Sequence, residues 1–190
     1  MPWLCVLVQG VAIVGSILPA VGMTPSAVVA QTFGAQVSHA QDASVLYDGK
    51  VLDTQLGLGG RLELPLFGLL RTGVLANARI VASLDRFFPD CDSLLGGASG
   101  CSYWEFNADL AAPLSLGSVE PYVGGGLNVG RTRFTSDAAG PRSFSDTELG
   151  LNLLGGLRFS LGAVTPFAEA RAELSGGEQF VLTGGVLIGG

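Results

Sequence analysis

The stretch from residue 104 to residue 114, WEFNADLAAPL, alternates between apolar and polar side chains. Glu105, Asn107 and Asp109 separate residues that are aromatic, aliphatic or small. Successive side chains of a β-strand point to opposite faces, so this pattern predicts a strand with one polar and one apolar face. The apolar face turns inward in a soluble sheet, whereas in a barrel that crosses a membrane the polar face does.

Composition narrows the choice between these two kinds of sheet. The 190 residues are 48% hydrophobic and only 14% charged, with a mean hydropathy of +0.48, whereas soluble domains carry about 25% charged residues. Beyond the N-terminus we find no run of about 18 apolar residues that would make a transmembrane helix. The chain is therefore either an unusually apolar soluble β-protein or a membrane β-barrel. Its net charge of −6 argues against a nucleic-acid partner.

The N-terminus predicts export. Residues 4–18 form an apolar core of signal-peptide length, and small residues at Val28 and Ala30 suit cleavage before Gln31. We therefore expect a cleavable signal peptide at 1–30 and an outer-membrane β-barrel at 31–190, with a buried N-terminal helix or a membrane anchor as the alternative. Cleavage would leave Cys91 and Cys101 as a pair in an oxidising compartment, which predicts a disulfide between them.

The mature chain divides into eight alternating segments. Segments of about 9 to 16 residues can cross a bilayer at a tilt, and they exceed the usual five or six residues of globular strands. An even number of strands also lets an antiparallel sheet close on itself. The sequence thus predicts an all-β, eight-stranded antiparallel up-and-down transmembrane β-barrel, with a soluble sandwich or lipocalin-like barrel as the alternative. The segments are 32–40, 52–64, 70–85, 103–114, 119–134, 146–160, 163–174 and 178–188.

Connection lengths also alternate along the chain. Short turns at one end and long polar loops at the other are typical of outer-membrane barrels, in which the short turns are periplasmic. The short connections are 65–69, 115–118 and the turn around Gly162, and the long ones are 41–51, 86–101 and 135–146, with a shorter loop at 175–178.

Charged residues recur at mid-strand on one face, while the other face is nearly uncharged. A barrel of eight strands has an interior just wide enough to be filled by side chains, and buried charges need partners. We therefore predict that the charged face points inward and that its residues pair into a network that plugs the lumen. The predicted network comprises Arg61, Glu63, Arg71, Arg79, Asp85, Glu105, Asp109, Glu148, Arg158, Glu169, Arg171 and Glu173.

From about Gln31 onward the chain resembles the small eight-stranded outer-membrane barrels of Gram-negative bacteria, of the OmpA-transmembrane-domain or OmpX type. The stretches EPYVGGGLNVG, TPFAEARAEL and QFVLTGGVLIGG carry the resemblance. One departure is the end of the chain, Ile188-Gly189-Gly190, where such barrels usually have an aromatic residue read by the assembly machinery. The resemblance implies an outer-membrane, porin-like monomer that contacts outer-membrane lipid and lipopolysaccharide and is inserted by the barrel-assembly machinery.

Few residues suggest catalytic chemistry. His39, the single histidine, adjoins Ser38, and some similar barrels are lipid A-modifying enzymes that use these residue types. Alternation places Ser38 and His39 on opposite faces, however, which suits a nucleophile–base pair poorly. We expect no enzyme, no cofactor and no metal site, and a structural or surface-interaction role whose loop ligand the sequence does not identify. A narrow pore for small solutes and an outer-leaflet lipid-modifying enzyme are the alternatives.

Aromatic residues near the strand ends predict two belts at the membrane interfaces. One belt lies at the second long loop and the other beside the short turns. The predicted members are Phe87, Phe88, Tyr103 and Trp104 in the first belt, and Phe67, Tyr122, Phe159 and Phe167 in the second.

Overall fold

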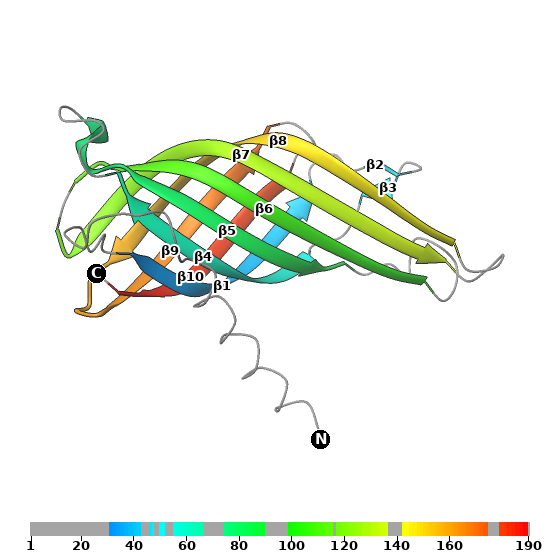
Figure 1. Cartoon of the computed structure of the whole chain (residues 1–190), viewed down its shortest axis with the longest axis horizontal. Helices are drawn as coiled ribbons and strands as arrows, with labels where there is room; N and C mark the ends of the chain where they lie inside the picture. Colours follow the sequence, from blue (N-terminus) through cyan, green and yellow to red (C-terminus); the bar gives the residue numbers. More distant parts are fainter. Residues whose placement is uncertain are drawn as a thin grey trace, which may run out of the picture.

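Eight long strands close into one antiparallel barrel in the computed structural model (Figure 1). A separate two-stranded sheet joins β2 (Leu46–Tyr47) and β3 (Lys50–Val51), and a 3-10 helix, η2, spans Val74–Asn77. The structure describes residues 31–42, 46–47, 50–51, 55–66, 74–89, 99–115, 117–136, 142–174 and 179–189. The barrel strands are β1 (Thr32–Asp42), β4 (Gln55–Pro65), β5 (Arg79–Phe88), β6 (Ser99–Pro113), β7 (Val119–Ser136), β8 (Arg142–Phe159), β9 (Val164–Glu173) and β10 (Gln179–Ile188).

The barrel closes where its first strand pairs with its last. The β1–β10 register runs from Phe33 opposite Ile188 to Asp42 opposite Gln179, and every other strand pairs with its neighbours in sequence order. We call the end that holds the connections 114–118 and 160–163 the turn end, and the opposite end the loop end. None of the described helical segments is long and apolar enough to span a membrane.

The polar face of the strands lies inside the barrel. Glu105 and Asn107 of β6 are fully buried, whereas Trp104 and Phe106, which alternate with them along the strand, are 41% and 47% exposed. The same alternation runs along β8, where Leu151 and Leu153 face outward around the buried Asn152. This arrangement is the reverse of a soluble sheet and confirms the predicted fold class, because a continuous apolar exterior suits lipid rather than water.

The third barrel strand begins later than the sequence predicts. The alternation predicts an extended segment over 70–85, but β5 begins at Arg79 and is preceded by η2. The alternating small residues Val74, Ala76 and Ala78 look like a strand face, yet Ala78 donates its N–H to the carbonyl of Leu75, a three-residue helical contact. The expected short turn at 65–69 is therefore wrong, because the β4–β5 connection runs over 66–78.

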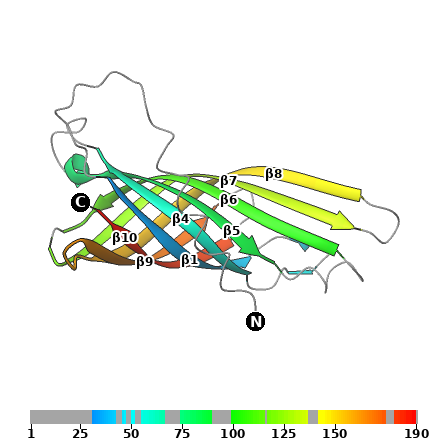
Figure 2. The ribbon, with the colours of Figure 1, turned by 60° about the horizontal axis from the view of Figure 1, so that its bottom comes forward.

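The third predicted loop is mostly strand. Of residues 135–146, positions 135–136 belong to β7 and 142–146 to β8, which pair up to Ser136 opposite Arg142. β6 follows β7 to the same level, with Ser99 opposite Ser136. We call this three-stranded extension, residues 99–102, 131–136 and 142–150, the arm. Figure 1 and Figure 2 show β6, β7 and β8 reaching farther at the loop end than β9 and β10.

Two predicted features fall wholly or partly outside the described residues. The signal peptide at 1–30 is one, and Cys91 is the other. Cys101 lies in β6, and its Sγ is 3.6 Å from the carbonyl oxygen of Pro89, two residues before Cys91 in sequence. The disulfide between Cys91 and Cys101 stays a prediction.

The aromatic belts are only partly as predicted. Phe88, Trp104 and Phe159 face outward, but Phe87, Tyr122 and Phe167 are buried inside the barrel. Tyr103 also turns inward, with its ring centroid 5.4 Å from that of Phe87, and Phe67 lies outside the described residues.

Glycines on neighbouring strands make room for these inward rings. A Cβ on Gly57 would lie 2.7 Å from the Phe87 ring, and one on Gly156 would lie 2.5 Å from the Tyr122 ring. The missing Cβ therefore lets each ring lie against the wall, which explains why strand-end aromatics occupy the lumen rather than a belt.

This packing predicts that Gly156→Ala destabilises the barrel by roughly 1–3 kcal/mol, because the new methyl group overlaps the Tyr122 ring and the backbone oxygen of Ala168. The matched control is Gly184→Ala, since a Cβ there meets nothing within 4 Å. Urea unfolding in detergent, followed by the difference in electrophoretic mobility between folded and heated protein, measures both variants. Equal midpoints for the two variants would contradict the packing described.

Candidate functional site

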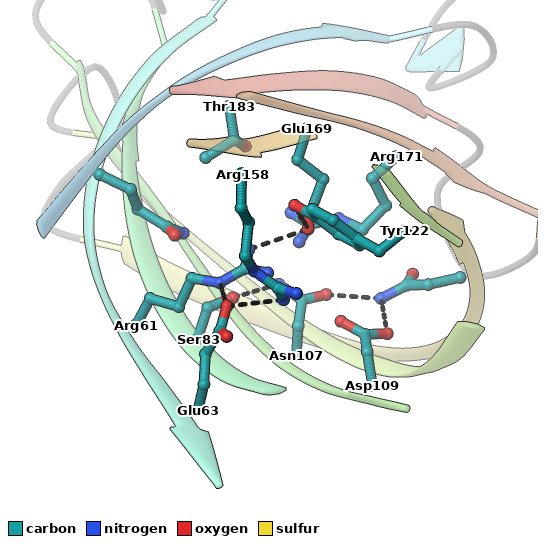
Figure 3. Close-up of polar contacts among 12 residues, drawn as sticks. Arg61, Glu63, Ser83, Asn107, Asp109, Tyr122, Arg158, Glu169, Arg171 and Thr183 are labelled. Atoms are coloured by element: carbon teal, nitrogen blue, oxygen red, sulfur yellow. Dashed lines mark hydrogen bonds and ion pairs between the residues drawn. The ribbon is translucent and has the colours of Figure 1, made fainter. Parts of the chain in front are cut away.

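The interior of the barrel holds most of its charged side chains. Figure 3 shows arginines, carboxylates and amides from different parts of the wall meeting inside it. Inward alternation on every strand brings them there, and their hydrogen bonds divide them into two clusters. The charged residues at most 7% exposed are Arg61, Glu63, Asp85, Glu105, Asp109, Glu120, Arg158, Glu169, Arg171 and Glu173.

The first group lies toward the turn end, and we call it the arginine cluster. Glu63 Oε1 accepts from Arg61 Nε at 2.8 Å and from Arg158 Nη2 at 2.9 Å. Arg158 Nη1 also donates to Glu120 at 2.9 Å, and Glu120 is paired with Arg79 as well. Arg61 Nη1 reaches Glu169 on the other side at 2.9 Å. Three arginines thus meet three glutamates, so their formal charges cancel.

Aromatic rings flank the arginine cluster. The guanidinium of Arg61 lies 4.5 Å from the Phe167 ring centroid, and that of Arg158 lies 4.0 Å from the Tyr122 centroid. The Tyr122 hydroxyl donates to Glu169 at 2.9 Å. Because cation–π contacts and charge-assisted hydrogen bonds act on the same planar groups, the guanidiniums are held in fixed orientations.

The second group lies from mid-barrel toward the loop end, and we call it the carboxylate cluster. It contains Asp85, Glu105, Asp109 and Glu173 around Arg171. Arg171 Nη2 is 2.7 Å from Glu105 Oε1, and its Nε is 3.4 Å from Glu173 Oε1. Four carboxylates face one arginine, which gives a formal charge of −3 when all are ionised.

Neutral donors support the carboxylate cluster in place of further cations. Gln36 Nε2 donates to both oxygens of Asp85 at 2.9 and 2.8 Å. Gln179 Nε2 lies 2.6 Å from Glu105 and 2.7 Å from Glu173. At mid-barrel, Asn152 Nδ2 donates to Asp109 at 3.2 Å. These amides stabilise the carboxylates without neutralising them.

The structure brings together ten of the twelve residues predicted for the network. Arg71 lies outside the described residues. Glu148 has the inward register of β8 but is exposed, and among the described residues no ion pair includes it. Its prediction as a lumen residue is wrong because the pairing of β9 with β8 reaches only Asn152, so Glu148 lies on the arm.

Sequence reasoning missed several members of the interior. Glu120 joins Arg79 to Arg158, and the amides of Gln36 and Gln179 hold carboxylates. The signal was present in 119–129, where the even positions include Glu120 and Tyr122 and the odd positions are apolar or glycine. An amide has no charge to mark it as a network member, so Gln36 and Gln179 were less visible.

Ser38 and His39 lie on opposite faces of β1, as expected from the alternation. Ser38 is buried in the lumen, with its Oγ 3.2 Å from Asp85 and 3.0 Å from Thr183 Oγ1. His39 is exposed on the outer surface. These two side chains therefore cannot act on one substrate as a nucleophile and its base.

Solved structures of outer-membrane barrels share this fold, although no family model and no curated protein sequence matches the chain. Neisserial surface protein A (NspA) matches with a TM-score of 0.58 at 17% identity, covering 83% of this chain and 96% of that one. Ail of Yersinia pestis, in complex with the heparin analogue sucrose octasulfate, gives 0.56 at 14% identity, covering 85% and 97%. The N-terminal barrel domain of Pseudomonas aeruginosa OprF gives 0.50 at 10% identity, covering 84% and 97%. The chain therefore has the fold of the small eight-stranded barrels of bacterial outer membranes.

The charge balance of the carboxylate cluster predicts the effect of removing its one arginine. Arg171→Gln leaves four buried carboxylates without a cation and should destabilise the barrel by about 3–5 kcal/mol. Adding Glu105→Gln should recover part of that loss, because it removes the carboxylate closest to Arg171. Urea unfolding of the two single variants and the double variant measures the coupling. Strict additivity of the two effects would show that the pair does not interact.

Proposed function

We propose that this chain is a bacterial outer-membrane protein with a structural or surface-interaction role. The filled lumen makes the barrel a rigid scaffold, and the loop end presents connections and the arm to partners outside the cell. The apolar exterior and the likeness in fold to NspA and Ail support the outer-membrane placement. Contact with outer-membrane lipid and lipopolysaccharide, assembly by the barrel-assembly machinery and a monomeric state are parts of this proposal.

The observation that supports the scaffold role is the set of ion pairs that cross the lumen between different strands of the barrel. Glu63 on β4 links to Arg158 on β8, and Arg61 on β4 links to Glu169 on β9. Opening a water-filled path would require these contacts to separate, and separating a buried ion pair is strongly destabilising. This argument favours a scaffold over the alternative of a narrow pore.

The separation of Ser38 from His39 supports a non-catalytic role over lipid modification. We assign partner binding to the loop end instead, where the arm extends beyond the closed wall. The solved complex of Ail with sucrose octasulfate shows that one barrel of this fold binds an anionic ligand. The partner of this chain is not identified by that likeness.

The scaffold proposal predicts that purified protein in planar bilayers gives no conductance, or only small and flickering openings. The paired lumen charges leave no stable aqueous path for ions. Arg158→Ala, which removes two of the links in the arginine cluster, should increase the frequency of openings. A stable, large conductance of the parent protein would overturn the plugged lumen and favour the pore.

The proposed orientation predicts which connections are reached from outside intact cells. A tag inserted near Gly140, between β7 and β8, should bind antibody on intact cells because this connection lies at the loop end. A tag near Gly117, between β6 and β7 at the turn end, should bind only after the outer membrane is permeabilised. Labelling at Gly117 but not at Gly140 would reverse the barrel in the membrane.

A further inference from the structure

The outward-facing charged residues of the described barrel strands are all of one sign. Among the described strand residues that face outward, we find three charged side chains, Arg86, Arg131 and Arg133, and no carboxylate. The whole chain has 16 acidic and 10 basic residues, so this segregation is not a reflection of composition. Asp146 and Glu148 lie nearby, but on the inward register of β8. A surface with these charges attracts anions.

Arg86, Trp104 and Arg131 lie at paired positions on three adjacent strands and form one row across the sheet. Arg86 on β5 is opposite Trp104 on β6, which in turn is opposite Arg131 on β7. The Arg86 guanidinium lies 5.3 Å from the ring centroids of both Trp104 and Phe88. Stacking uses the face of a guanidinium, so its N–H edge still suits a planar or tetrahedral oxyanion.

The row lies directly beyond the last apolar row of the wall. Leu84, Phe106 and Val129 face each other across β5, β6 and β7 one step nearer the turn end, and they are 49%, 47% and 37% exposed. Strands about 4.8 Å apart with a tilt near 40° place Arg86 and Arg131 about 6 Å apart in height. That span is comparable to one headgroup layer of a bilayer, roughly 5–8 Å thick.

We propose that Arg86, Trp104 and Arg131, with Arg133 beyond them, bind a phosphate group of an outer-leaflet glycolipid, the phosphorylated lipid A portion of lipopolysaccharide. The apolar row beneath accommodates acyl chains while the guanidiniums hold the phosphate, which matches an amphiphile better than a soluble anion. The inference rests on the proposed outer-membrane placement and assigns that lipid contact to one side of the barrel, over β5–β7.

The test uses Trp104 as its reporter. The chain has two tryptophans, so full-length protein carrying Trp3→Phe is folded into phosphatidylcholine nanodiscs and titrated with lipopolysaccharide. We expect a saturable change in Trp104 emission, a much weaker response to phosphatase-treated lipopolysaccharide, and no displacement by inorganic phosphate or sucrose octasulfate. R86Q/R131Q should weaken binding at least tenfold, because the variant loses two charge-assisted contacts with the phosphate. To separate this loss from a changed Trp104 signal, binding is also measured by co-sedimentation of labelled lipopolysaccharide.

The control variant K50Q/R142Q removes the same charge from β3 and from the inward register of β8, and should bind as the parent does. Equal binding by the parent and R86Q/R131Q would overturn the site, as would equal affinity for phosphatase-treated lipid. Displacement by sucrose octasulfate would indicate a soluble polyanion site instead. Failure of the folded parent to insert into nanodiscs would contradict the membrane placement itself, and with it this site.

Discussion

Closure of β1 against β10 is the constraint on which the rest of the molecule depends. A closed sheet satisfies its backbone hydrogen bonds within the wall, so the exterior can be apolar along its whole length. Closure with eight strands also fixes the interior at a width that side chains fill. Because the exterior takes the apolar face, the polar face must fill the lumen. The two charged clusters are the consequence of that geometry.

The two clusters solve the problem of buried charge in different ways. In the arginine cluster, Glu63, Glu120 and Glu169 each have an arginine nitrogen within 2.9 Å. The rings of Tyr122 and Phe167 pack against the guanidinium groups. In the carboxylate cluster one arginine serves four acids, and amides and hydroxyls supply the other hydrogen bonds. The turn end of the lumen thus pairs three carboxyl groups with three arginines, whereas the carboxylate cluster has four carboxyl groups and one arginine.

Much of the fold could be predicted from the sequence because two-residue periodicity reports strand faces directly. The alternation in 147–159 identified Asn152 and Arg158 as inward, and both are buried. The same signal failed for Val74, Ala76 and Ala78, since small residues alternate by chance and η2 needs no special pattern. It also placed Glu148 in the lumen, because periodicity gives the face of a residue but not the point where the neighbouring strand ends. The inward position of the Phe87 and Tyr122 rings depends on the glycine that lies across from each ring. Which glycine that is depends on the register between strands, which the periodicity of one strand does not give.

In the described part of the chain the arm has an unpaired strand edge, which affects whether two copies of this protein can pair through their sheets. Beyond Leu151, β8 has no partner strand on its β9 side among the described residues, and nine residues, 142–150, at about 3.3 Å each leave an open edge of about 30 Å. A flat, apolar edge of this length would pair with the same edge of a second molecule. Here the edge sequence is RSFSDTELG, and its exposed Asp146 and Glu148 bring like charges together in any such pairing. Glu148, which lies on the arm instead of in the lumen, thus protects the molecule, together with Asp146, against edge-to-edge aggregation.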